Sequence, residues 1–318
     1  MDVPPASVAP SGFRRLAGWV AAGPWCQSAR RLMERNFEQY DLPLSRWGKL
    51  AAGSWLILND YAEGRFPPRF EDQQAAYRAE MEFHSSMTSY TRQESIAGHV
   101  VKPFWTPEWF LQYSKSFARL WEVLRSLGLQ PGARLLELGC GAGWMTEFLA
   151  LGGYVITGTT IAPDDVQIGE GRMRALVARG LPAERLQFRQ APMESVDTAV
   201  ADLPRFDGAF VFEALHHAYD WQAAIHAAAR CLKPGGWLLL ANEPNRVHTL
   251  VSYRVSRLTN THEIGMSGPA LRAELRAAGL GEIRTFAPRL DLRLTAHWVA
   301  GRAAASGPGS PTDLRDVP

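Results

Sequence analysis

Two adjacent histidines, His216 and His217, are the residues of this sequence best suited to moving a proton. An imidazole titrates near neutrality, so it can accept a proton from a substrate hydroxyl group. Both follow an apolar run at 206–213 that is typical of a buried strand. They would therefore lie at the carboxyl end of a parallel sheet, where open α/β folds bind ligands. The histidines could line an active site or supply a general base, or they could merely pack against the loop and cap it.

A second stretch has the residues needed to hold a ligand. It begins with an apolar run at 133–139, passes through Gly139, Gly141 and Gly143, and continues at helical spacing over 142–151. Glycines let the backbone approach a ligand closely, and the N-terminus of the following helix offers unpaired N–H groups. The spacing is not the Gly-x-Gly-x-x-Gly of a dinucleotide site. The alternative is a tight turn in an unrelated α/β sheet.

An acidic residue, Glu137, stands two positions before Gly139. The combined pattern resembles the first motif of class I S-adenosylmethionine-dependent methyltransferases, acidic-x-Gly-x-Gly-x-Gly. Phe206-Asp207 and the Leu-Lys-Pro-Gly-Gly block at 232–236 resemble later blocks of that family in the same order. The resemblance covers residues 130–300. It implies S-adenosyl-L-methionine (SAM) as the cofactor, with the glycine loop around its amino acid end and Glu137 helping to anchor it.

The resemblance also implies where the rest of the cofactor would lie. The family usually ends its second strand with an acidic ribose ligand, but this chain has Thr160 there. Asp165, with Asp164 as second choice, is the candidate ribose ligand, while Thr160 is expected to line the site. Both aspartates could instead favour the first turn of a helix. Pro192 replaces the aspartate that often contacts adenine, and Met193 could pack on the adenine ring.

Further polar residues fall near the same predicted edge of the sheet. Glu243 ends the fifth predicted strand, so it would lie near the methyl acceptor or would be only a loop charge or helix cap. His262 lies in the insert before the sixth predicted strand. These two residues and the paired histidines could be imagined around a metal ion. No ligand spacing supports such a site, and no metal is predicted.

Composition argues against several classes of function. The formal net charge is +2, so there is no bulk positive charge for nucleic acid binding. The cysteines, Cys26, Cys140 and Cys231, are odd in number and widely spaced, which favours a reducing, cytoplasmic setting over a disulfide framework. No apolar run reaches the roughly 18 residues that an integral membrane span needs.

The N-terminal third has the spacing of helices, which we predict over 28–40, 44–61, 71–83 and 112–127. Residues 1–12 are rich in proline and alanine and are expected to be loose. The basic and then apolar stretch 13–20 could be a helix packed on its own domain, a membrane-surface helix or a weak signal peptide. The stretch 84–110 interleaves polar and aromatic residues with little period, which is typical of a lid or pocket wall and equally of an irregular connector.

After residue 133 the sequence alternates between strands and helices, which predicts an α/β fold with a parallel sheet. The resemblance implies a Rossmann-like, seven-stranded, mostly parallel sheet with helices on both faces and an antiparallel last strand. Strands are predicted near 133–139, 154–160, 185–190, 206–213, 235–242, 281–287 and 292–300, and helices near 142–151, 164–179, 219–231 and 268–279.

Three parts of the chain are expected: a helical extension or cap at 1–110, a SAM-binding methyltransferase domain at 111–300 and a disordered tail at 301–318. The extension would cover the acceptor site and could form a homodimer. The expected function is transfer of a methyl group to a small-molecule acceptor, at oxygen. The alternatives are a SAM-binding enzyme with non-methylating chemistry and a non-catalytic binding protein on the same fold.

Overall fold

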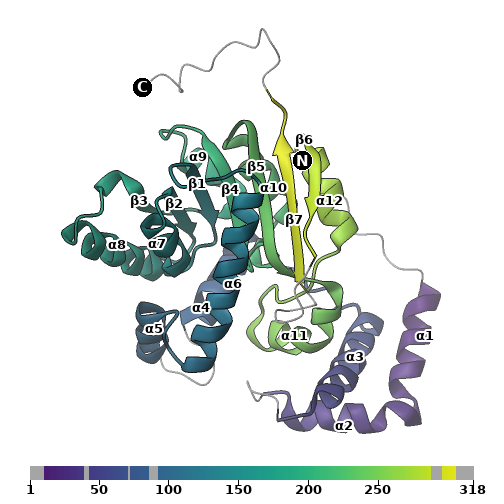
Figure 1. Cartoon of the computed structure of the whole chain (residues 1–318). Coiled ribbons are helices and arrows are strands. Elements are labelled where there is room, and N and C mark those ends of the chain that lie inside the picture. Colours follow the sequence, from purple (N-terminus) through teal and green to yellow (C-terminus); the bar gives the residue numbers. More distant parts are fainter. Residues whose placement is uncertain (1–10, 39–42, 71, 86–91, 288–295, 306–318) are drawn as a thin grey trace. The chain divides into compact units, whose positions relative to one another are not determined.

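The computed structural model describes residues 11–38, 43–70, 72–85, 92–287 and 296–305 (Figure 1). Internal contacts divide the chain into two units, and each is described by itself. The helical unit combines the chain up to Phe83 with the segment 246–264. The sheet unit contains 84–245 and the chain from Gly265 onward. No helix within the described residues is long and apolar enough to cross a bilayer.

The sheet unit is built on seven strands in the order β3-β2-β1-β4-β5-β7-β6. The pairs from β3 to β5 are all parallel, whereas β7 runs antiparallel to both β5 and β6. The predicted Rossmann-like, mostly parallel sheet with an antiparallel last strand is confirmed. The strands are β1 (Arg134–Leu138), β2 (Val155–Thr160), β3 (Leu186–Gln190), β4 (Phe206–Phe212), β5 (Leu232–Pro244), β6 (Leu280–Thr285) and β7 (Ala296–Ala303).

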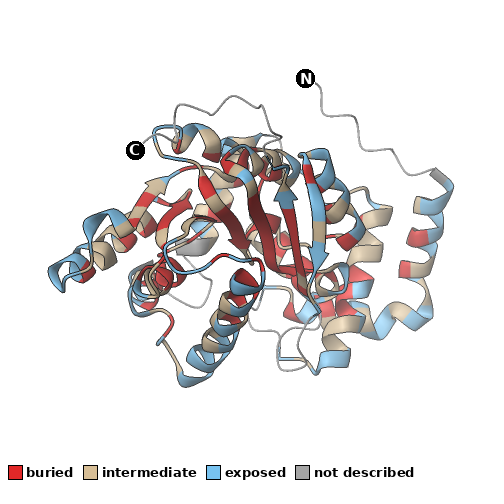
Figure 2. Cartoon of the chain, turned by 45° about the horizontal axis from the view of Figure 1, so that its top comes forward, coloured by how far each residue is buried: buried red, intermediate tan, exposed pale blue. Residues whose placement is uncertain are grey.

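Helices cover both faces of this sheet, because successive side chains of a strand point to opposite faces. Leu135 of β1 belongs to a core cluster with α6, α7 and α8, while Leu136 belongs to a second cluster with α9, α10 and α12. The central strands are buried on both sides, as Figure 2 shows in red. The helices of the sheet unit are α5 (Arg92–Val101), α6 (Pro107–Ser126), α7 (Trp144–Leu151), α8 (Pro163–Ala178), α9 (Val196–Ala199), α10 (Trp221–Arg230) and α12 (Gly268–Ala277).

The helical unit has its own small apolar core. Met33, Trp55, Leu56 and Tyr253 are buried together in it, and Tyr253 comes from the segment between β5 and β6. That segment was expected only as an insert, and most of it is a helix. The helices of this unit are α1 (Ser11–Ala22), α2 (Gln27–Asn36), α3 (Arg46–Ala62), α4 (Gln73–Ser85) and α11 (Arg246–Thr259).

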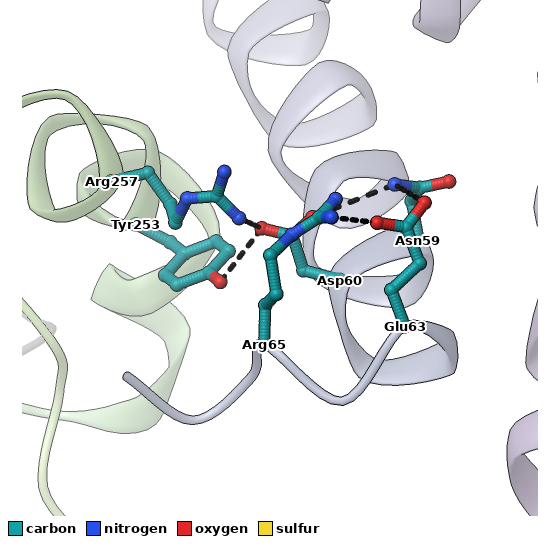
Figure 3. Close-up of polar contacts among 6 residues, drawn as sticks. All are labelled: Asn59, Asp60, Glu63, Arg65, Tyr253 and Arg257. Carbon is teal, nitrogen blue, oxygen red and sulfur yellow. Dashed lines mark hydrogen bonds and ion pairs between the residues drawn. The ribbon is translucent and has the colours of Figure 1, made fainter. Parts of the chain in front are cut away.

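A buried carboxylate, Asp60, joins α3 to α11 within the helical unit (Figure 3). One of its oxygens accepts a hydrogen bond from Arg65 Nη2 at 2.7 Å, and the other accepts from the Tyr253 hydroxyl at 2.8 Å. The guanidinium of Arg257 also donates to the second oxygen. Since a buried charge is costly unless it is paired and hydrogen-bonded, these donors allow Asp60 to remain inside.

The structure differs from the sequence expectations at several boundaries. The low-period stretch 84–110 contains α5 and the start of α6, and contacts group it with the sheet unit rather than with the N-terminal helices. The helix α1 begins at Ser11, inside the stretch expected to be loose. Strand β7 runs to Ala303, so the first residues of the expected tail pair with β5 and β6. Residues 306–318 lie outside the described residues.

Candidate functional site

The glycine turn follows β1 and leads into α7. The φ angles of Gly139, Gly141 and Gly143 are 70°, 51° and 76°, a left-handed conformation that favours glycine. A Cβ atom on Gly139 would lie 2.7 Å from the Met193 methyl carbon, and one on Gly143 would lie 2.3 Å from the Phe188 ring. The turn therefore needs glycine for both its conformation and its space. It also brings Met193 next to Gly139.

Glu137, at the end of β1, is a buried carboxyl group beside this turn. Burial raises its pKa to about 8, although a hydrogen bond from the Thr146 hydroxyl, at 2.6 Å, and the charge of Lys102 act in the opposite direction. A positive charge nearby lowers the pKa of a buried carboxyl group and so favours its ionised form. The chemistry of Glu137 thus suits a ligand whose end carries positive charge.

Lys102 lies in the connection between α5 and α6. Its ammonium nitrogen is 4.8 Å from the centre of the Tyr113 ring, within the range of a cation–π contact. Burial lowers the pKa of Lys102, while the charges of Glu213, Asp165 and Glu137 raise it and only partly compensate. Lys102, from the stretch 84–110, is therefore close enough to three carboxyl groups at the sheet edge for their charges to raise its pKa.

Arg172 of α8 attaches the end of α5 to the sheet unit. Its Nη2 atom donates to the carbonyl oxygens of His99, Val100 and Lys102 at 2.8–3.0 Å, and its Nη1 atom donates to Glu147 at 2.6 Å. A cation at a helix C-terminus satisfies carbonyl groups that have no partner within the helix. The end of α5 is thereby tied to α8 and, through Glu147, to α7. Sequence reasoning missed this role of Arg172, because a contact to backbone carbonyls has no residue pattern.

The two candidate ribose residues lie where β2 ends and α8 begins. Asp165 is buried in the first turn of α8, and its Oδ1 atom is 3.3 Å from His99 Nδ1. Thr160 is buried at the end of β2 and accepts a long hydrogen bond, 3.4 Å, from the Ala162 N–H group. Asp164 is more exposed than Asp165, so Asp165 remains the first candidate.

The paired histidines lie directly after β4, in the short helix η4 (Leu215–His217). His216 is buried and its Nδ1 atom is 3.0 Å from a carboxylate oxygen of Glu243. The ring centre of His217 is 4.1 Å from that of His216. Both predicted residues therefore lie at the carboxyl edge of the sheet, and His216 has a specific acidic partner.

Glu243 is fully buried near the end of β5, and it accepts hydrogen bonds from the backbone N–H groups of Ala214 and Leu215 at 2.9 and 3.0 Å. Burial alone would raise the pKa of Glu243, but the hydrogen bonds from His216 and from these backbone groups outweigh burial and lower it. Glu243 is therefore a carboxylate that caps η4 and orients the His216 ring. A carboxylate at Nδ1 favours hydrogen on that nitrogen and makes Nε2 the basic one.

A pair of strained residues lies on the same edge of the sheet. Glu213 follows β4 and Asn242 lies in β5, and their φ angles are 49° and 57°. The Asn242 amide donates to the Glu213 carboxylate at 3.0 Å. Such conformations are uncommon away from glycine and tend to occur at functional sites. Sequence reasoning missed both residues, because positive φ at a non-glycine residue leaves no pattern in the sequence.

His262, which the sequence places in the insert before β6, belongs to the helical unit, where its backbone N–H group donates to Glu80 at 2.9 Å.

Comparison with known proteins gives a consistent family. Residues 110–283 match the family described as a methyltransferase domain. The ubiquinone biosynthesis O-methyltransferase of Alkalilimnicola ehrlichii is 35% identical over 123 residues, which cover 39% of this chain and 47% of the relative. The S-adenosyl-L-methionine-dependent Diels-Alderase iccD of Talaromyces variabilis is 29% identical over 197 residues, covering 60% of this chain and 65% of that protein. The chain thus spans less than two thirds of the length of either relative.

A solved structure agrees in fold. The magnesium protoporphyrin IX methyltransferase of Synechocystis, determined with bound S-adenosylhomocysteine, has a TM-score of 0.51 and 18% sequence identity to this chain. The likeness covers 71% of this chain and 97% of that one.

Proposed function

The chain belongs to the S-adenosylmethionine-dependent methyltransferases, and we propose that it transfers the methyl group of SAM to an oxygen atom of a small-molecule acceptor. The observation that carries the proposal is His216, held by the buried carboxylate Glu243 at the carboxyl edge of β4 and β5. A hydroxyl acceptor must lose its proton on methylation, and an oriented imidazole is suited to take it.

Each cofactor residue has a chemical counterpart in SAM, which supplies an electrophilic methyl group on a positively charged sulfur. The raised pKa of Glu137 fits an amino acid end that bears an ammonium group, and the glycine turn of Gly139, Gly141 and Gly143 lets the backbone approach it. Lys102 provides a cation that suits the carboxylate of the same end.

The remaining cofactor residues would contact the nucleoside. Asp165 and Thr160 would bind the ribose hydroxyls, since both are buried at the end of β2 and the start of α8. Met193, beside Gly139, would pack on the adenine ring. Holding the donor and the acceptor in line accounts for much of the rate of such a displacement.

His216 would take the acceptor proton through Nε2 as the new O–C bond forms. Glu243 would then stabilise the imidazolium across the contact at Nδ1 and keep the ring in place. Because Glu243 also accepts from the backbone of η4, the ring and the loop are positioned together. His217 would line the acceptor pocket beside it.

The acceptor proposed is a hydroxyl group on a small organic molecule. Relatives named ubiquinone biosynthesis O-methyltransferases favour an oxygen target. A cytoplasmic location, a homodimer and a cap function of the N-terminal helices over the acceptor remain predictions from the sequence.

A second candidate is a SAM-binding enzyme that promotes a reaction without methyl transfer. A relative named as a SAM-dependent Diels-Alderase favours it, and so do Thr160 and Pro192, which depart from the usual family residues. The two candidates differ in one product, because only methyl transfer converts SAM into S-adenosylhomocysteine.

Calorimetric titration with SAM and with S-adenosylhomocysteine tests the cofactor assignment. Saturable binding by the wild type that is lost in Gly141→Val supports it, whereas a folded wild type that binds neither ligand contradicts it. Incubation with a panel of phenols and hydroxyquinones then tests the reaction. Formation of S-adenosylhomocysteine in step with a methyl ether supports methyl transfer, and a transformed substrate with intact SAM favours the second candidate.

A further inference from the structure

The helix α1 has small apolar residues on its buried face and large apolar residues on its exposed face. Its small residues Ala17 and Ala21 are buried in the helical unit, and a Cβ atom on Gly18 would lie 3.5 Å from the Cβ of Ala62 in α3. Small side chains here allow the two helices to pack closely. The larger apolar side chains of α1 are then left on the other face.

That outer face is large and apolar. The exposed fractions of Phe13, Leu16 and Trp19 are 63%, 57% and 67%, and that of Trp25, just after α1, is 72%. Figure 2 shows exposed residues in pale blue along this helix, alternating with buried and intermediate ones. We call these four residues the α1 apolar face. A single exposed apolar residue needs no explanation, but Phe13, Leu16 and Trp19 are spaced three residues apart and so lie on one side of α1, which marks an interaction surface.

The charge around the α1 apolar face indicates the chemistry of its partner. Residues 11–36 contain five arginines and one glutamate, while the whole chain has a net charge of only +2. Four of these arginines, Arg15, Arg30, Arg31 and Arg35, are exposed, and Arg30 forms an ion pair with Glu34. The partner should therefore combine an apolar interior with negative charge at its surface.

We propose that the α1 apolar face binds the surface of an anionic lipid bilayer. Tryptophan, phenylalanine and leucine beside exposed arginine are the residues of helices that lie in the headgroup region. A helix of 12 residues is about 18 Å long, too short to span the bilayer but sufficient to lie along it. This inference does not depend on the proposed chemistry of the sheet unit.

A second copy of the chain fits this face less well. In a two-fold dimer the same surface meets itself, so the arginines of residues 11–36 would lie near their equivalents and repel one another. A bilayer that contains acidic lipid has the opposite charge and attracts them.

Co-sedimentation with lipid vesicles tests the inference. The full chain is mixed with vesicles of phosphatidylcholine alone or with one quarter phosphatidylglycerol, and bound protein is measured at low and high salt. We expect binding to the acidic vesicles that weakens as salt rises. Leu16→Ser and Trp19→Ser together should weaken it on the order of tenfold.

Leu151→Ser is the matched control, because Leu151 lies on α7 of the sheet unit and its exposed fraction, 58%, is close to the 57% of Leu16. For charge, Arg15→Glu should weaken binding by roughly tenfold, while Arg179→Glu, an exposed change at the end of α8, should leave it unchanged. Circular dichroism verifies that each variant is folded.

Four results would overturn the inference. These are no binding of the folded wild type to acidic vesicles, equal binding to neutral vesicles at all salt concentrations, loss of binding in the Leu151 control, and retained binding after the Leu16 and Trp19 changes. A concentration-dependent dimer that dissociates on the Leu16 and Trp19 changes, without vesicle binding, would assign the face to a second copy instead.

Discussion

His216 Nδ1 lies 3.0 Å from a carboxylate oxygen of Glu243, and both side chains are buried where β4 and β5 end. The sheet unit contains a second pair of the same chemistry, His226 of α10 and Glu274 of α12, at 2.8 Å. That pair is partly exposed and joins two helices, whereas His216 and Glu243 lie at the ends of strands. The molecule therefore offers its own control for the role of a histidine–carboxylate pair.

The first prediction concerns this pair. His216→Gln should reduce the rate of methyl transfer by roughly 10²–10⁴, because it removes the proton acceptor, while SAM affinity changes little. His226→Gln should leave the rate within about twofold of the wild type. Steady-state kinetics and calorimetry measure the two quantities. A His216 variant with a normal rate would exclude it as the general base.

The second prediction concerns pH and Glu137. Its pKa rises from 4.5 to about 8 on folding, so the folded protein keeps a proton that the unfolded chain has lost. The stability of the ligand-free protein should therefore fall as pH rises from about 5 to 8, by up to roughly 4 kcal/mol from this group. Urea denaturation across this range measures the slope.

Glu137→Gln should remove most of that slope, since an amide does not titrate. Glu122→Gln, an exposed change on α6, should keep it. If the wild type and the Glu137 variant lose stability in parallel as pH rises, Glu137 is not the group responsible.

The third prediction concerns Arg172. Arg172→Lys should release the end of α5, because one ammonium group cannot reach three carbonyl oxygens and Glu147 together. We expect faster hydrogen exchange over 99–102, a loss of about 1–3 kcal/mol in stability and weaker SAM binding. Arg174→Lys, an exposed change two residues along α8, is the control. Unchanged exchange in the Arg172 variant would contradict the assigned role.

The fourth prediction concerns the helical unit. Asp60→Asn should destabilise it by about 3–5 kcal/mol, because Arg65 and Arg257 lose a buried anionic partner. Asp202→Asn, which breaks a mostly exposed pair with Arg189, should cost less than about 1 kcal/mol. Thermal unfolding followed by circular dichroism compares them. Similar melting curves for the two variants would show that the buried contacts of Asp60 contribute little.

The core strands and helices were predictable because their signals are local. Apolar runs ended by glycine or proline placed β1 to β5 close to their observed bounds, and the glycine spacing identified the turn before α7. The family resemblance supplied the antiparallel last strand. The helices α5 and α11 were not predicted. The stretch that contains α5 mixes polar and aromatic residues with little period, whereas the apolar residues of α11 recur at helical spacing from Val247 to Leu258, so that helix could have been found.

For the candidate site, the sequence predicted which residues lie at the same edge of the sheet but not which of them contact one another. Strand order puts His216 and Glu243 on one edge, but their hydrogen bond depends on the conformation of η4. Arg172 donates to the backbone carbonyl of Lys102, 70 positions earlier in the chain. Because every residue type has this carbonyl, the sequence cannot indicate the contact. Contacts of that kind become visible only when the chain is folded.

The contact between Asp60 and Tyr253 has a consequence for how the protein is made. The two residues are 193 positions apart, yet they share one small core. A ribosome adds about 5–20 residues per second, so the N-terminal helices would wait roughly 10–40 seconds for the segment that completes them. During that time β1 to β5 emerge and can pair. The unit that starts first in synthesis is therefore finished late, and the apolar residues that α11 would cover stay open to solvent in the interval.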